Sequence, residues 1–323
     1  MNVGYFCTYI PEEIILSCHA TPKFLFPDLL SPTQTLPYLP IPFCPFSKAI
    51  LNDLLSEKNH DLDYLVFGGS CDAAKKLYDI YTSLQPKTPC YYLHIPLIHN
   101  EESLKFYRHS LHNLAENLFS FQGISQQNYI ENLTKILNHS YQVKKAYSEA
   151  FLTGKLSGDF FLKEKKQPPS SWSLRTSSKV PVLLIASHLF VQDLIQLLEE
   201  KEFLVFDGSA LGMRRYVFPD IEYPSQSDAL DSLARWYLLN KVPCPGYDPQ
   251  KRLDIVQKFI NRVNLQGLVY FYPKFCDQAL YELSFIKKHL KIPVLPIEHD
   301  TSFSSVGQWE TRIDAFREVL SNR

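Results

Sequence analysis

One arrangement, a strand followed by a cysteine, an aspartate and a helix, occurs twice in this sequence and limits the fold more than any other feature. Residues 64–80 form the first copy, in which an apolar run leads through Gly-Gly-Ser to Cys71 and a helical pattern. Residues 267–282 form the second copy, with Cys276 in the same place. A thiol at a helix start faces unpaired backbone N–H groups and the positive end of the helix dipole. These features predict a lowered thiol pKa and a thiolate able to bind metals or attack substrates.

Proline-flanked cysteines extend this internal repeat. Cys44 lies in Pro-Phe-Cys-Pro and Cys244 in Val-Pro-Cys-Pro, and each precedes a helical pattern and then the strand of its copy. Strands separated by single helices indicate a parallel, doubly wound sheet. Ligands of such sheets bind beyond the carboxyl ends of the strands. The sequence therefore predicts two α/β domains of the Rossmann or flavodoxin type, with Cys71 and Cys276 at the cleft between them.

The segments between these repeats set the expected domain division. Leucines and isoleucines recur at helical spacing between 104 and 137, and residues 163–179 are rich in Lys, Pro and Ser, as in a linker. Residues 27–46 are rich in proline and predict an extended crossing loop. We predict a first α/β domain over 1–100 carrying Cys44 and Cys71, a helical segment and linker over 101–179, and a second α/β domain over 180–323 carrying Cys244 and Cys276.

Charge and composition exclude several classes of partner. The 323-residue chain has a formal net charge of -1 and 45% apolar residues, which indicates a globular protein without an electrostatic footprint for nucleic acid. The first residues do not resemble a signal peptide, and no apolar stretch approaches the ~20 residues of a membrane span. We expect a cytoplasmic protein with no membrane partner. Its seven scattered cysteines should stay reduced.

Reduced thiols leave packing, catalysis and metal binding as alternatives. Soft thiolates select iron–sulfur clusters, zinc or copper(I), but the paired Cys-x-x-Cys spacing of structural zinc sites is absent. Cysteines from several loops of two domains suit an interdomain iron–sulfur cluster better, whereas buried cysteines in a metal-free protein are the simpler alternative. The sequence has no P-loop, dinucleotide fingerprint or Gly-x-Ser-x-Gly motif. The loop 206–215, with Arg214 and Arg215, is either an anion site or an ordinary surface loop.

Several short motifs together resemble a known family. In chain order they are Gly4-Tyr-Phe-Cys-Thr-Tyr-Ile-Pro-Glu-Glu-Ile-Ile, Cys44-Pro-Phe, Gly69-Ser-Cys-Asp72, Lys274-Phe-Cys-Asp277, Glu298-x-Asp300 and Gly307-Gln-x-x-Thr-Arg312. They span almost the whole chain and resemble the 2-hydroxyacyl-CoA dehydratase and benzoyl-CoA reductase subunit family, in particular the D-component of 2-hydroxyglutaryl-CoA dehydratase.

The resemblance implies an oxygen-sensitive [4Fe-4S] cluster held by Cys44, Cys71 and Cys276, with one iron left open. It also implies a separate ATP-hydrolysing activator, which injects a low-potential electron so that an acyl-CoA substrate forms a ketyl radical and expels its leaving group. Such an enzyme is a lyase that works in anaerobic metabolism. The family usually pairs two related subunits, so this chain is expected in a heterodimer or a homodimer.

Four residues of the N-terminal motif are candidate catalytic groups. Thr8 and Tyr9 are expected to hydrogen-bond an oxygen on the open iron, and Glu12 or Glu13 to move a proton. Capping of the following helix by Thr8 and the glutamates is the equally weighted structural alternative.

The remaining cysteines and the chain length leave other questions open. Cys244 is a candidate fourth ligand, whereas Cys7, Cys18 and Cys90 are expected to pack in the core. The chain is shorter than typical family members, and the loop 206–215 lacks the cysteine that relatives often carry there. A cluster-carrying electron-transfer subunit and a benzoyl-CoA-reductase-type subunit therefore remain alternatives to a dehydratase.

Overall fold

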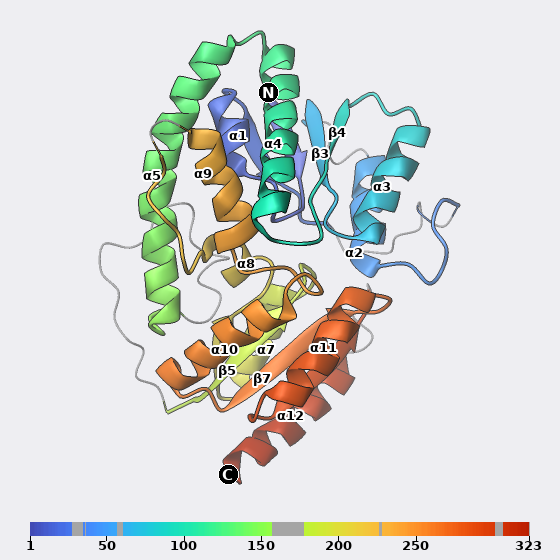
Figure 1. Ribbon diagram of the computed structural model, residues 1–323. Coiled ribbons are helices and arrows are strands. Elements are labelled where there is room, and N and C mark those ends of the chain that lie inside the picture. Colours follow the sequence, from blue (N-terminus) through green and yellow to red (C-terminus); the bar gives the residue numbers. More distant parts are fainter. Residues whose placement is uncertain are drawn as a thin grey trace.

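The chain folds around two parallel four-stranded sheets. The computed structural model describes residues 1–27, 35, 37–56, 61–156, 178–225, 228–300 and 306–322. The sheets have the orders β2-β1-β3-β4 and β6-β5-β7-β8, so each second-sheet strand has a first-sheet counterpart at the same place. Figure 1 shows the first sheet in the upper part of the molecule and the second in the lower part. The predicted α/β class with two doubly wound units is confirmed.

The first sheet has helices on both faces because its strands are apolar on both sides. Leu65 and Phe67 of β3 pack among residues of one face, and Tyr64 and Val66 pack on the other. The strands are β1 (Asn2–Tyr5), β2 (Thr21–Phe24), β3 (Tyr64–Gly68) and β4 (Cys90–Leu93). One face is covered by α2 (Pro45–Leu55) and α3 (Asp72–Ser83), the other by α1 (Glu12–Ser17), α4 (Glu101–Gln122) and α5 (Gln126–Leu152).

The second sheet repeats this plan. Its strands are β5 (Val180–Ala186), β6 (Phe203–Asp207), β7 (Gly267–Pro273) and β8 (Val294–His299). One face carries α7 (Val191–Glu200) and α12 (Val306–Ser321), and the other carries α10 (Pro249–Val263) and α11 (Asp277–His289). A single apolar cluster joins α2 and α3 of the first unit to α7 and β5 of the second, so the two units share core packing.

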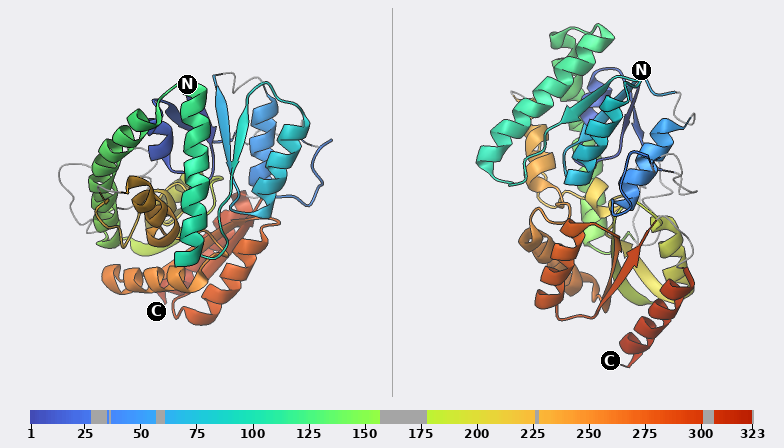
Figure 2. Two further views of the ribbon diagram at one scale, coloured as in Figure 1. Left: turned by 45° about the horizontal axis from the view of Figure 1, so that its top comes forward. Right: turned by 90° about the vertical axis from the view of Figure 1, so that its right-hand side faces the viewer.

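Helices α4 and α5 form the helical segment that the sequence predicts over 101–151. They meet at Gly123, whose φ of 67° is a left-handed C-cap that favours glycine. Near the far end of α5, Phe151 stacks on Phe259 of α10 with ring centroids 4.9 Å apart. The hairpin therefore reaches from the first unit to the second, as two further views show (Figure 2).

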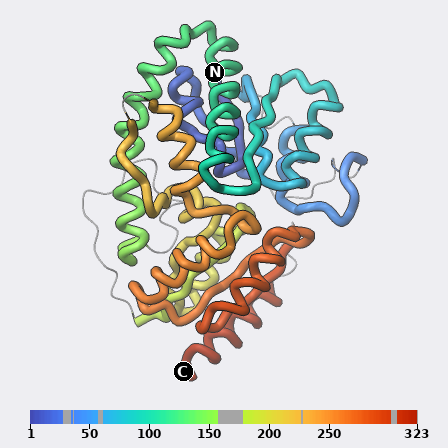
Figure 3. Tube along the Cα trace, in the orientation of Figure 1, coloured from blue at the N-terminus to red at the C-terminus, as the bar shows by residue number. Residues whose placement is uncertain are grey.

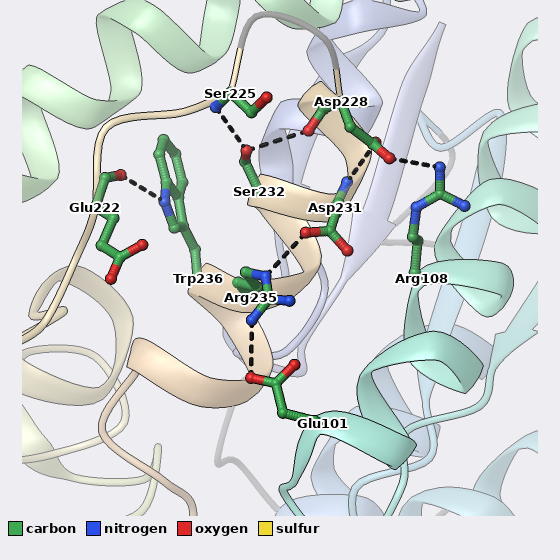
Figure 4. A network of polar contacts seen from close by, with 9 residues as sticks. All are labelled: Glu101, Arg108, Glu222, Ser225, Asp228, Asp231, Ser232, Arg235 and Trp236. Atoms are coloured by element: carbon green, nitrogen blue, oxygen red, sulfur yellow. Dashed lines mark hydrogen bonds and ion pairs between the residues drawn. The ribbon is translucent and has the colours of Figure 1, made fainter.

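A connection of the second half also packs on the first. It contains α8 (Met213–Tyr216), α9 (Ala229–Arg235) and the π-helical turn η2 (Trp236–Asn240). Asp228 caps α9 and pairs with Arg108 of α4 at 2.9 Å, and Arg235 pairs with Glu101 at 2.8 Å (Figure 4). The indole of Trp236 donates to the carbonyl of Glu222 at 3.0 Å. This network fixes the segment that leads into the Cys244 loop.

Some expectations differ from the structure or fall outside it. Helix α2 begins at Pro45, directly after Cys44, and the short strand β2 was not expected. The crossing loop is described only at 27, 35 and 37–46, and the linker only at its last two residues. No helix in the described part of the chain is long and apolar enough to cross a membrane. Figure 3 follows the trace through both units.

Candidate functional site

Three helix starts bring cysteines to one cavity between the two sheets. Cys44, Cys71 and Cys276 are the N-cap residues of α2, α3 and α11, so the expected position before a helix is correct for all three. All three line a cavity of about 120 Å³. Cys71 and Cys276 follow the third strand of their respective sheets, and the cavity lies where the carboxyl ends of those strands face each other.

Two further thiols line the same cavity. Cys7 follows β1, is buried, and donates from Sγ to the hydroxyl of Ser70 at 3.2 Å. The Sγ of Cys244 lies 3.8 Å from the hydroxyl oxygen of Thr8. The backbone amide of Cys244 donates to the hydroxyl of Tyr9 at 3.1 Å. Cys7 is therefore more than a packing residue, because its thiol faces the same space as the other four.

Burial favours the protonated form of four thiols, those of Cys7, Cys44, Cys71 and Cys276. It raises the pKa of Cys71 to about 12 and the pKa values of Cys276 and Cys7 to about 11, and it raises the pKa of Cys44 as well. The amide of Ala74 donates to Cys71 Sγ at 3.4 Å but offsets only part of this effect. The expectation of a lowered thiol pKa is therefore wrong for the protein without a metal, because desolvation outweighs the helix N-terminus. Metal binding must release protons here.

The possible metal donors that line this cavity are thiols and one imidazole. Within the described ranges, no three His, Cys, Asp or Glu side chains are grouped so that they could hold one metal ion. Four thiolates around one zinc lie about 3.8 Å apart, given Zn–S bonds of about 2.3 Å. The thiolates of a cluster bind different irons and stand farther apart, and iron–sulfur clusters are held by cysteines. Five thiols and no carboxylate line this cavity, which suits soft-ligand chemistry.

The first half of the N-terminal motif lies beside the cavity. Thr8 lines it, whereas Tyr9 is fully buried and its carbonyl accepts a hydrogen bond from Tyr107 at 2.6 Å. The ammonium of Lys241, which is also buried, donates to the carbonyl of Thr8. Burial lowers the pKa of Lys241 to about 7. Thr8 thus faces the cavity, and Tyr9 and Lys241 support its loop from behind.

Glu12 faces a second cavity of about 300 Å³, which Thr8 also lines. Its carboxylate lies 2.5 Å from the guanidinium of Arg215 and accepts a hydrogen bond from Tyr5. Burial alone would raise the pKa of Glu12, but the charge of Arg215 outweighs it and holds that pKa below its usual value. Glu12 is therefore an ionised partner in a contact between the start of α1 and α8.

Glu13 lines the second cavity as well. It pairs with Lys144 of α5 at 3.1 Å and accepts a hydrogen bond from Tyr237 at 2.9 Å. Neither Thr8 nor the glutamates cap α1, whose N-cap is Pro11 without a side-chain bond. The helix-capping alternative is therefore wrong, and both carboxylates instead join α1 to distant parts of the chain.

The loop that carries Cys244 is held by a buried ion pair. Arg252 of α10 and Glu282 of α11 are almost completely inaccessible and pair with each other, and Arg252 also donates to the carbonyl of Pro243. The hydroxyl of Tyr270 donates to Glu282 at 2.6 Å. Farther along the loop, Tyr247 donates to the carbonyl of Ser70 at 2.6 Å. Cys244 is thus positioned by contacts with both units.

Some residues at the cavity were not singled out from the sequence. His188 follows β5, and its ring stacks on Phe46 at 4.3 Å. Burial lowers the pKa of His188 well below its usual value. The topology rule that places ligands at strand ends could have found His188, whereas nothing local marks Lys241 as buried. Of the two arginines in the loop 206–215, Arg214 lines the thiol cavity and Arg215 the second one.

The fold and this cavity define a class of protein: two doubly wound α/β units that present cysteines to a shared cleft. Residues 7–320 match the family model described as 2-hydroxyglutaryl-CoA dehydratase, D-component, and the chain belongs to this family. It is 22% identical over 349 aligned positions to the (R)-phenyllactyl-CoA dehydratase beta subunit of Clostridium sporogenes, covering 98% of this chain and 91% of that protein. A stretch of 97 positions is 34% identical to the putative dehydratase subunit YjiM of Escherichia coli (strain K12), covering 29% of this chain and 25% of that protein.

Proposed function

We propose that this chain is the iron–sulfur subunit of a 2-hydroxyacyl-CoA dehydratase. One observation carries the proposal: three N-cap thiols from two sheets, Cys44, Cys71 and Cys276, line a single cavity. Membership of the dehydratase family supports the reaction class. We infer that these three residues hold a [4Fe-4S] cluster, whose negative charge the N-termini of α2, α3 and α11 would stabilise.

The cluster, when bound, would supply the low-potential electron for elimination of water from a 2-hydroxyacyl-CoA. We infer that Thr8 donates a hydrogen bond to a ligand oxygen in the cavity. Its position in the cavity lining, with its hydroxyl beside Cys244, supports this role. Tyr9 holds the amide of Cys244 and so orients that loop. Glu12 and Glu13 are engaged with Arg215 and Lys144, so either carboxylate would move a proton only after its ion pair opened.

The proposed enzyme needs partners. The relative from Clostridium sporogenes is named as a beta subunit. We infer that this chain likewise pairs with a homologous subunit, as a heterodimer or a homodimer, and that an ATP-dependent activator delivers the electron. The family description supports a CoA thioester as the substrate.

The test is strictly anaerobic reconstitution of the purified chain with iron and sulfide. We expect acid-labile sulfide, about four irons per chain as for a [4Fe-4S] cluster and a brown chromophore. Replacing Cys44, Cys71 or Cys276 by Ala should each abolish the chromophore. The matched controls are Cys18→Ala and Cys90→Ala, since neither thiol lines the cavity, and both should keep it. Full iron content in the Cys276→Ala variant would exclude the assignment.

Cys244 needs its own variant. If it is a fourth ligand, Cys244→Ala should load fewer clusters and change the spectrum, whereas an open iron predicts a normal spectrum. Its thiol lines the cavity next to Thr8, a position that is compatible with a fourth ligand and with an open iron.

The size of the cavity supports a second candidate, a cluster-carrying subunit that transfers electrons without binding the substrate itself. The volume of about 120 Å³ is small beside the roughly 300–1,000 Å³ of typical small-molecule sites. Turnover of a panel of 2-hydroxyacyl-CoA thioesters and of benzoyl-CoA, with activator and with or without a second subunit, separates the candidates. Activity of a homodimer supports a complete dehydratase, and ring reduction of benzoyl-CoA indicates a reductase instead.

A further inference from the structure

The charges around the thiol cavity are unequal. The lining contains five cysteines, one arginine and one histidine, and no carboxylate. Thiolates that bind a metal or cluster there accumulate negative charge on buried and half-buried side chains, where it is costly without a compensating cation. His188 offers no compensating charge, because burial lowers its pKa well below the usual value. The guanidinium of Arg214 is therefore the permanent positive charge in the described lining.

Arg214 is held in place without a charged partner. Only 4% of its surface is exposed, and one of its terminal nitrogens donates to the carbonyl of Ala186 at 3.3 Å. The Nε atom has no hydrogen-bond partner, and none of the ion pairs among the described residues includes Arg214. A buried cation normally has a paired anion. Its neighbour Arg215 follows that rule, since it pairs with Glu12.

The field of Arg214 reaches the cavity. Its charge is among the effects that lower the pKa of Cys276, although burial dominates and raises it. It also acts on Asp207, a buried carboxyl of the same loop that lies beyond ion-pair distance and outside the cavity lining. Asp207 thus compensates part of the charge from outside the lining, of which Arg214 itself is a member.

We propose that Arg214 is the counter-cation of the thiol cavity, built to stabilise anionic metal–thiolate groups and to raise the potential of the cluster held there. The inference rests on the proposed function for the cluster, but the charge arrangement extends to any soft metal that the thiols bind. It gives a role to the loop 206–215, which contains no cysteine. Arg214 acts through its charge on the groups that the thiols bind and does not itself react, so it is a positioning residue and not a catalytic one.

The first test is an anaerobic redox titration of the loaded protein with titanium(III) as the one-electron reductant. Arg214→Met should lower the equilibrium constant for one-electron reduction about tenfold, which corresponds to a potential about 59 mV more negative. Arg214→Lys keeps the charge and should retain most of the wild-type potential. Arg262→Met, at an exposed position of α10, should leave it unchanged. An unchanged potential in a folded, loaded Arg214→Met variant would overturn the proposal.

A second test separates failure of this inference from failure of the proposed function. Iodoacetamide alkylates the thiolate form of a cysteine and releases iodide, so the rate of this reaction in the cluster-free protein reports how far a nearby cation stabilises the thiolate. Following alkylation of Cys276 by mass spectrometry at one fixed pH, we expect Arg214→Met to react about tenfold more slowly than Arg214→Lys. If the wild type takes up no iron but shows this difference, the cluster assignment fails and Arg214 keeps its role. Equal rates would contradict the role of Arg214.

Discussion

The two sheets place equivalent thiols with different loops. Cys71 and Cys276 both cap the helix after the third strand of a sheet with the same strand order. The first loop reaches its cysteine through Gly68 and Gly69, whereas the second passes through Phe275, which has a φ of 60°. The sheet topology therefore sets the position of the thiol, and the two loops reach it with different backbone conformations.

The loops after the other strands differ in the side chains that they bring to the cavity. After β1 the first unit supplies Cys7 and Thr8, whereas after β5 the second supplies Ser187 and His188. The segment after β2 ends in Cys44, and the segment after β6 brings Arg214 to the cavity instead. The first unit thus contributes most of the sulfur and the second contributes the cation. The two units share one strand order, but the charged and thiol side chains that they bring to the cavity differ.

The largest expected effect concerns the contacts that hold the loop of Cys244 in the second unit. Cys44 caps its helix directly, but Cys244 lies in a loop held by the buried pair of Arg252 and Glu282. Arg252→Met should lower the free energy of unfolding by about 3–5 kcal/mol, because it leaves a buried carboxylate without its partner. Chemical denaturation of the cluster-free protein measures this loss.

Two further variants make that prediction specific. Arg262→Met lies on the same helix at an exposed position, and its effect should stay below about 1 kcal/mol. The double variant Arg252→Met, Glu282→Gln should recover much of the stability. If the single variant is as stable as the wild type, the ion pair does not hold the loop.

The next effect is a pH dependence of the free energy of unfolding, which arises from Asp207 at the end of β6. Burial raises the pKa of Asp207 from 3.8 to about 6. The stability that comes from its protonated form is complete below pH 3.8 and is lost as the pH rises through 6. The wild type should therefore lose roughly 2–3 kcal/mol relative to Asp207→Asn between pH 4 and pH 8.

Denaturation of both proteins at the two pH values gives this difference. A constant offset between them, caused by the new amide, cancels in the comparison. A difference that stays the same would mean that folding does not change the pKa of Asp207. A difference that grows in the opposite direction would mean that Asp207 is stabilised as a carboxylate in the folded protein.

The sequence was sufficient for features that depend on local patterns. The strands around the two central cysteines, the helix starts and the repeated unit all follow from hydrophobic periodicity and turn residues. The strand β2 was missed because it is a four-residue edge strand containing Pro22, and proline argues against a central strand but is tolerated at an edge.

The site was less accessible to sequence reasoning because its energetics depend on burial and on distant partners. The pKa of Cys71 is raised rather than lowered, since helix starts are visible in a sequence and desolvation is not. Glu12 meets Arg215 about two hundred positions later, so no local pattern could show that it is ion-paired. The ligand roles of the three N-cap cysteines stay a prediction.

A smaller effect tests why the first loop needs glycine. A Cβ atom at Gly68 would lie 2.6 Å from Cβ and 2.7 Å from Sγ of Cys7. Gly68→Ala should therefore destabilise the protein by about 1–3 kcal/mol through overpacking, and it should displace the Cys7 thiol. The matched control is Gly307→Ala in α12, where nothing lies within 4 Å of the added Cβ. That variant should be neutral or up to about 1 kcal/mol more stable. Equal effects at both sites would contradict the close approach at Gly68.

The smallest effect concerns Phe275, directly before the cysteine of the second loop, where the backbone is left-handed but the residue is not glycine. Phe275 is half exposed, so its ring contributes little packing, and its φ of 60° disfavours any residue with a Cβ. Phe275→Ala removes the ring and keeps the backbone strain, whereas Phe275→Gly removes both. We expect the Gly variant to be more stable than the Ala variant by about 1 kcal/mol, which is the order expected at Gly68 and the reverse of the order expected at Gly307. At position 275 the cause is the left-handed backbone, whereas at Gly68 it is the close approach of Cys7. Thermal or chemical denaturation of the two variants measures the difference. If alanine is the more stable residue at 275, the left-handed backbone there has no measurable cost.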